Sequence, residues 1–315
     1  MKFNLSEQPI QSVYGGQAVI EGVMFAGQKV HVTAVRKKDH SIEFLEVPKK
    51  EIPWVNKLKK IPFLRGIVAI VESSAKGAQH LNFAAESYAD EEEKEKKEPG
   101  FWGNFSLILG MAVIGVLSFL VGKVVMSAVP AMIEQILFKN LFSNQILHNL
   151  IEGVIKIILL LSYIYFLSLT PMIKRLFQYH GAEHKVISAY EAGVELTVSN
   201  VQKFNTLHYR CGSSFIVFTV MVGVIIYSFF PYSGMVERII QRIVLIPVVI
   251  GVSYEVLRLT NSLRDVPVLR YLGYPGLWLQ KLTTKEPTDE QVEVSIASFN
   301  RMREADRRLT KGMIV

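Results

Sequence analysis

The sequence is poor in cysteine and lacks the marks of several protein classes. Cys211 is the only cysteine, so an intrachain disulfide is impossible and a disulfide-stapled secreted fold is excluded. The opening residues, MKFNLSEQPIQSV, lack the apolar core of a secretory signal, so we expect the chain to begin in the cytosol. No motif combines basic and aromatic residues in the manner of nucleic-acid-binding proteins, and we expect no nucleic-acid partner. No internal repeat is present either, which removes the usual signature of a repeat-built transporter.

Apolar residues are abundant and are gathered in blocks. Of the 315 residues, 50% are hydrophobic and 20% are charged, with a formal net charge of +7. A helix needs roughly 20 apolar residues to cross a bilayer. Four runs meet that length, at residues 106–129, 150–171, 213–232 and 239–260. The sequence therefore predicts a polytopic α-helical membrane protein with about four spanning helices, whose membrane domain covers residues 105–262.

The basic residues predict the orientation of these spans. The central loop, residues 174–212, and both terminal regions are rich in Lys and Arg. The other two connections hold few basic residues, with Arg238 and Arg242 at the second of them. Basic loops of membrane proteins stay on the cytoplasmic side. We therefore expect a multi-pass protein with both termini and the central loop in the cytoplasm, and with membrane lipids as partners.

The residues before the first run predict a small N-terminal α+β cytoplasmic domain. Residues 1–60 are rich in strand patterns, and KVHVTAVRKKDHSIEFLEV predicts a β-hairpin. Residues 61–89 form an amphipathic helix that either packs on the hairpin or, as we favour, lies in the membrane interface. Residues 90–104 are a charged linker. At the other end of the chain, residues 263–315 form a cytoplasmic membrane-edge segment and a helix that Thr288 can cap.

Two histidines in the stretch HGAEHK suggest a metal site. Good helix formers run from Pro171 to Gly193, so His180 and His184, four residues apart, share one helix face. Their H-x-x-E-H order is that of the inverted zinc peptidases, in which a glutamate such as Glu183 takes a proton from water. The alternative is a pair of interfacial histidines that bond to lipid headgroups or loop carbonyls.

A second pair of metal-binding residue types precedes the third apolar run. His208 and Cys211 in LHYRCGSSF carry an imidazole and a thiol, the usual ligands of zinc. The central loop returns to the same membrane face, so both pairs can meet. If all four side chains bind, the site is closed and structural, whereas three ligands leave a catalytic position open. Alternatively, Cys211 is simply a small buried residue.

Four further residues are candidates for the site. Glu255, inside the fourth run, is either a ligand or proton acceptor or the ion-pair partner of Arg258. Glu191 continues the face of His184. Glu21 lies among apolar residues and glycines, with Arg65 as its expected partner.

Five motifs together resemble a known family. GGQAVIEGVMF, PFLRG, HGAEHKVISAYEAG, HYRCGSSF and PGLWLQKLTTKEPTDEQVEVSI are similar to the YqhQ family, a domain of unknown function described as a predicted metal-dependent enzyme. The resemblance implies a bacterial integral membrane protein with metal ligands at His180, His184, His208 and Cys211 and an acid-base residue at Glu183. Tyr209 and Ser213 depart mildly from the family pattern without touching those residues.

These features favour a metal-dependent hydrolase at the cytoplasmic face of a bacterial plasma membrane. The cofactor is a divalent metal, with zinc favoured by imidazole and thiolate donors. A lipid headgroup or a membrane-bound peptide is the expected substrate. The alternatives are a non-catalytic scaffold or lipid-handling protein with a structural metal, and a small transporter. With four spans, a transporter would call for a homo-oligomer.

Overall fold

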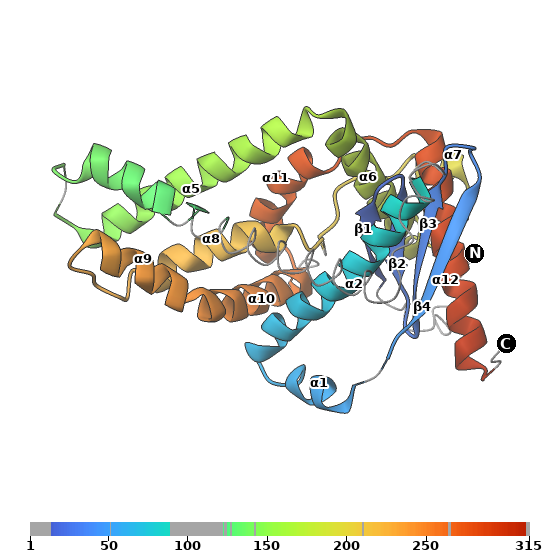
Figure 1. Ribbon diagram of the computed structural model, residues 1–315, viewed down its shortest axis with the longest axis horizontal. Coiled ribbons are helices and arrows are strands. Elements are labelled where there is room, and N and C mark those ends of the chain that lie inside the picture. Colours follow the sequence, from blue (N-terminus) through green and yellow to red (C-terminus); the bar gives the residue numbers. More distant parts are fainter. Residues whose placement is uncertain are drawn as a thin grey trace, which may run out of the picture.

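The computed structural model describes residues 14–50, 52–88, 122, 125–126, 128–141, 143–209, 211–263 and 266–312. The charged linker expected at residues 90–104 and most of the first apolar run, 106–129, lie outside these residues. Figure 1 shows a sheet covered by helices at one end of the molecule and an arm of long helices extending from it.

The sheet is antiparallel, and its strands follow the order β1-β2-β3-β4. Two hairpins build it: β1 (Gly15–Val19) with β2 (Gly22–Ala26), and β3 (Val30–Arg36) with β4 (Ile42–Pro48). The second is the hairpin that alternation of apolar and polar residues predicts. In the first, Ile20 and Glu21 form a two-residue turn, for which a positive φ such as the +51° of Glu21 is typical. Because β1 is the first strand in the order of the sheet, it is an edge strand.

The C-terminal helix completes the core of the N-terminal sheet. α12 (Asp289–Thr310) packs across β2 and β3 and contacts α6 (Pro171–Glu191) and α7 (Val198–Val201). Phe299 and Met302 of α12 are fully buried with Phe25 of the sheet. Thr288 caps α12 in a capping box with Gln291, as the sequence indicates. The two ends of the chain therefore form one folded unit, and α6 is held against it.

The opposite face of the sheet is covered by α2 (Leu64–Tyr88), which follows the short α1 (Pro53–Leu58). α2 contacts β1, β3 and β4 and, at its beginning, α10 (Ile246–Ser262). Its buried residues include His80 and Ala84. The helix predicted at residues 61–89 is thus present at Leu64–Tyr88, and it packs on the sheet, which is one of the two alternatives given above.

Two buried histidines lie between α2 and the sheet. The rings of His31 and His80 are 5.8 Å apart, and His80 Nδ1 is 2.6 Å from Thr33 Oγ1. Within the described residues, both nitrogens of His31 and Nε2 of His80 have no hydrogen-bond partner. Burial and the nearby Lys49 and Lys76 lower the pKa of His31 to about 3, against a smaller opposing effect of Glu72. Burial and Lys76 also lower the pKa of His80.

We expect this pair to make the protein less stable in mild acid. An unfolded histidine binds a proton below about pH 6.5, but folded His31 does so only near pH 3. The unfolded state therefore gains protons first, and the free energy of unfolding falls as the pH drops from about 6.5, by up to about 1.4 kcal/mol per pH unit for each histidine. Denaturant unfolding at a series of pH values from 7.5 to 5 measures this slope. In the His31→Phe variant the slope should be smaller, and an unchanged slope would assign the acid sensitivity to other groups.

The arm consists of α5 (Gln145–Ser168), α8 (Ser214–Tyr227), α9 (Met235–Val244), α10 and α11 (Tyr274–Thr283), with the 3-10 turn η1 (Leu269–Gly273) before α11. A further helix, Ala128–Phe138, is short and apolar. α8 packs against α5, α10 and α11. Figure 1 shows α5 and the α8 to α10 layer running side by side away from the sheet.

The prediction of four spanning helices is wrong. Among the described residues, α5 is the one helix that by itself is long and apolar enough to cross a membrane. The run at 213–232 contributes a helix of 14 residues, about 21 Å long, against a hydrocarbon core of about 30 Å. The run at 239–260 is broken between α9 and α10, which differ in direction by 52° and would make at most one further, bent span. Window hydropathy detected the apolar content of these runs but not where their helices begin, end and bend.

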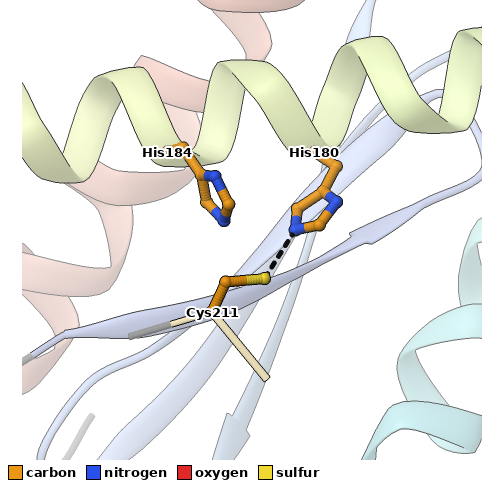
Figure 2. A group of neighbouring side chains, drawn as sticks. All are labelled: His180, His184 and Cys211. Carbon is orange, nitrogen blue, oxygen red and sulfur yellow. Dashed lines mark hydrogen bonds between the residues drawn. The ribbon is translucent and has the colours of Figure 1, made fainter. Parts of the chain in front are cut away.

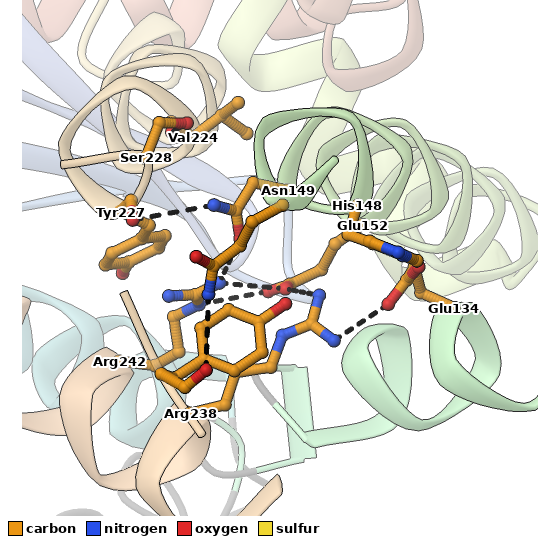
Figure 3. Close-up of polar contacts among 11 residues, drawn as sticks. Glu134, His148, Asn149, Glu152, Val224, Tyr227, Ser228, Arg238 and Arg242 are labelled. Atoms are coloured by element: carbon orange, nitrogen blue, oxygen red, sulfur yellow. Dashed lines mark hydrogen bonds and ion pairs between the residues drawn. The ribbon is translucent and has the colours of Figure 1, made fainter. Parts of the chain in front are cut away.

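Arg238 and Arg242, which the sequence analysis assigned to the connection between the third and fourth apolar runs, lie in the helix α9. Both are buried, and both reach Glu152 of α5 (Figure 3). Arg238 also donates to Glu134 at 2.8 Å, and Glu134 bonds to Nδ1 of His148. These four charged side chains and His148, which we call the arm ion cluster, join α5, α9 and the helix Ala128–Phe138. The apolar arm therefore contains a buried group of charged side chains at its end away from the sheet.

Candidate metal centre

The site is built on α6, whose limits are set by the sequence. Thr170 precedes the helix in an extended conformation, and Pro171 occupies its first turn, where a missing N–H costs nothing. The chain leaves the helix through Gly193, whose φ of +69° favours glycine. His180 and His184 consequently share one face, and their ring centroids are 4.4 Å apart.

Backbone carbonyls orient both imidazoles. His180 Nδ1 lies 2.8 Å from the carbonyl oxygen of Thr283, and His184 Nδ1 lies 2.5 Å from that of Thr206. A carbonyl only accepts, so each Nδ1 carries a proton, and in the neutral tautomer that this selects the lone pair is on Nε2. Burial and the neighbouring His180 lower the pKa of His184, which favours its neutral form. Carbonyl-oriented neutral imidazoles are the form in which histidine binds metals.

Cys211 brings a sulfur to the same point (Figure 2). Its Sγ lies 3.2 Å from His180 Nε2 and 3.0 Å from Ser213 Oγ. Burial raises the pKa of the thiol. Ligand atoms of His180, His184 and Cys211 all lie within 4.8 Å of one another, so one ion could contact all three. This is the only such group within the part of the chain that the structure describes.

Glu183 lies beside this group and turns towards β1. It accepts a hydrogen bond from the backbone N–H of Gly16, and its Oε2 is buried with no partner within the described residues. A Cβ on residue 16 would come within 3.0 Å of the Glu183 carboxyl carbon, so only glycine leaves that space. Burial, reinforced by Cys211, raises the pKa of Glu183 to about 7, despite the opposing effects of His180 and the Gly16 N–H.

His208 lies near the three donors but outside their group. Its ring centroid is 5.7 Å from that of His184, and its Nε2 is 3.7 Å from Glu191 Oε2. Gln280 of α11 holds the loop: its side chain accepts from the His208 N–H and donates to the His208 carbonyl, both at 2.8 Å. Glu191 therefore faces His208 and does not join the three-donor group.

The other predicted candidates lie away from the centre and pair differently from what we expected. Glu21 is bound by Arg175, with Nε to Oε1 at 2.5 Å, and not by Arg65. Arg65 forms a two-point ion pair with Glu255, which also accepts from the N–H of Phe63. The reason is the docking of α2 on α10, which places Arg65 against Glu255. Glu255 thus neither reaches the histidines nor needs Arg258.

A cavity of about 330 Å³ opens beside the donors. Residues 14–18 of β1 and its approach form one wall, and α6 and the loop at 208–213 form the others. Its lining includes His180, Glu183, His184, His208 and Cys211. The carbonyls of Thr206 and Thr283, the N–H of Gly16 and the side chain of Gln280 escaped sequence reasoning. Backbone groups leave no residue-type signal, and these lie up to 167 positions from Glu183 in the chain.

Comparison with known proteins gives a family but no activity. Residues 61–305 match a family model described as "Protein of unknown function (DUF1385)". The chain is also 55% identical over 305 residues to the "Uncharacterized protein YqhQ" of Bacillus subtilis (strain 168), covering 95% of this chain and 94% of that protein. No solved structure matches the chain. All three donor residues lie within the matched residues.

Proposed function

Because the chain belongs to the DUF1385 family, whose description names no activity, we propose from its site that it is a metal-dependent hydrolase. The resemblance to the YqhQ family is thereby confirmed. One observation carries the proposal: three convergent donors stand at a cavity beside a buried carboxyl, one oxygen of which has no partner among the residues that the structure describes. A buried polar atom without a partner is uncommon and calls for a role.

The donor set fits zinc. Two imidazole nitrogens and one sulfur are borderline-soft ligands, and catalytic zinc sites of this composition keep a fourth position open. Zinc bound there would polarise a substrate carbonyl and acidify water. The raised pKa of Cys211 does not oppose binding, since a coordinating thiol loses its proton to the metal.

The chain's own residues would do the remaining work. The carbonyls of Thr283 and Thr206 hold the two imidazoles in one tautomer. The Gly16 N–H fixes one oxygen of Glu183, which leaves Oε2 to accept a proton from water and return it to the leaving group. The cavity beside these groups has room for a substrate.

A structural metal is the second candidate, and the place of His208 favours it. If His208 turned from Glu191 towards His184, it would close the site as a fourth ligand. The cavity at the donors supports the open form. The two candidates differ in whether the metal can bind an added ligand, because a closed site has no open coordination position.

We also propose that the arm contacts membrane lipid. α5 is apolar and long enough to span, yet little of it is buried by the rest of the chain. Ile146, Leu150, Val154 and Ile158, four residues apart, are each about half exposed or more. An apolar helix of a soluble core would bury such a stripe. Lipid covering α5 would place the metal centre near a membrane surface.

The metal proposal is tested by metal content. The chain is purified without a metal-binding tag, and zinc per chain is measured by mass spectrometry. We expect about one equivalent in the parent and less than about one tenth in the variant with both His180→Ala and His184→Ala, since each removed ligand weakens a site of three donors. The control is His40→Asn, which removes an exposed turn histidine at a φ of +66° that asparagine tolerates. A folded parent that takes up no zinc would sink both metal candidates.

A further inference from the structure

The free edge of β1 forms a wall of the cavity. β1 is the edge strand of the sheet, and residues 14–18 line the cavity opposite the three donors. Val19 and Gly22 flank the two-residue turn and form a hydrogen-bonded pair. Along β1 from there, every second residue is hydrogen-bonded to β2 and the residues between are not. Gln17 and Gly15 bond to β2, whereas the N–H and C=O of Gly16 and Ala18 point away from it. The bond from the Gly16 N–H to Glu183 agrees with this direction.

This edge offers the backbone groups of Ala18 to the cavity. Within the described residues, no hydrogen bond reaches the backbone of Ala18 from beyond the sheet. Gly15 and Gly16 carry no side chains, so another backbone can approach closely. A Cβ on residue 15 would meet nothing within 4 Å, so the face of the strand is open at that residue. An alkyl chain laid along this edge would leave its N–H and C=O groups unsatisfied.

We propose that the substrate is a polypeptide in extended conformation, which adds to the free edge of β1 as a further strand. The inference rests on the proposed hydrolase function and names its substrate class. Main-chain bonds to an exposed sheet edge are a common way of binding peptides. A strand bonded to the N–H and C=O of Ala18 and to the C=O of Gly16, whose N–H stays with Glu183, would lie along the edge of β1 in the cavity, with one carbonyl at the donors His180, His184 and Cys211.

The reaction balances with water alone. The oxygen of water bonds to the carbonyl carbon of the peptide, and the C–N bond of that peptide breaks. Glu183 takes one proton from water and delivers it to the departing amine, so a new carboxylic acid and a new amine result. At neutral pH the proton of the acid passes to the amine, which gives a carboxylate and an ammonium group. No oxidant or reductant takes part.

Hydroxamate probes test the binding mode without relying on turnover. The zinc-loaded full chain is titrated by calorimetry with acetohydroxamate, with the hydroxamate of acetyl-trialanine and with octanohydroxamate, an alkyl probe. We expect the peptide probe to bind at least about 10-fold more tightly than acetohydroxamate, the equivalent of one or two added hydrogen bonds. The affinity of the alkyl probe should exceed that of acetohydroxamate by a smaller factor.

Methylated probes report the strand geometry. In an extended peptide only every second N–H faces the edge of β1. N-methylation of one amide should therefore abolish the tighter binding of the peptide probe relative to acetohydroxamate, whereas N-methylation of the next amide should not affect it. The Ala18→Pro variant removes an N–H that points away from β2, at an edge position where proline is tolerated. This variant should bind acetohydroxamate as tightly as the parent does and should bind the peptide probe no more tightly than acetohydroxamate. Should this variant not fold, the methylated series decides by itself.

The outcomes separate the two proposals. If acetohydroxamate does not bind to the zinc-loaded chain, the open metal position and with it the hydrolase proposal are overturned. If acetohydroxamate binds but the peptide probe gains nothing, or the alkyl probe gains more, the peptide inference alone is overturned and a lipid substrate takes its place. Equal losses on methylation at neighbouring amides would also overturn it.

Discussion

Replacing Glu183 by Gln is expected to leave the zinc content at that of the parent and to lower peptide cleavage by about 100-fold or more. Glu183 is not one of the three donors, so the ion should stay. Its Oε2 has no hydrogen-bond partner within the described residues and can accept a proton, whereas the carboxyl group is held in place by the Gly16 N–H. General-base catalysis contributes typically 10²- to 10⁴-fold, and an amide cannot supply it. Cleavage is followed by mass spectrometry on a digest of a denatured protein.

Glu191→Gln is the matched control on the same helix. Glu191 is partly exposed and lies 3.7 Å from His208, away from the three donors. This variant should retain most of the parent's cleavage rate. If Glu183→Gln cleaved as fast as the parent with its zinc in place, Glu183 would not be the base. Full zinc content with no cleavage even in the parent would favour the structural metal.

Local features of the fold were predictable because their causes are local. Alternation along residues 30–48 gives the β3–β4 hairpin, Pro171 and Gly193 mark the two ends of α6, and Thr288 marks the start of α12. The spacing of His180 and His184 fixes their common face once the helix exists. Each of these depends on residues within about one turn or one strand of each other, so a single sequence contains the information.

Features set by distant packing were not predictable. Arg65 could pair with any nearby acid, and only the docking of α2 on α10 selects Glu255 over Glu21. The burial of α12 by the sheet joins segments more than 250 residues apart. Apolar composition alone could not separate a span from a packed helix, because a 14-residue helix such as α8 and a bent pair such as α9 and α10 satisfy the same hydropathy window. The proximity of His180, His184 and Cys211 was therefore easier to predict than the architecture around them.

The arm ion cluster leads to the second prediction, a large loss of stability on neutralising Glu152. Its carboxylate accepts from Arg238 at 2.5 Å and from Arg242 at 3.0 Å, and Arg242 Nη1 and Arg238 Nε have no partner within the described residues. Glu152→Gln leaves these buried guanidinium groups with one carboxylate, Glu134. Removing one member of a buried ion pair costs about 3–5 kcal/mol because an uncompensated charge remains, so we expect the free energy of unfolding to fall by that amount in denaturant titrations. Arg301→Gln, which breaks an exposed pair with Glu46, should cost at most about 1 kcal/mol. A loss for Glu152→Gln as small as that of the control would mean that water reaches the cluster and that the arm is held by its apolar contacts alone.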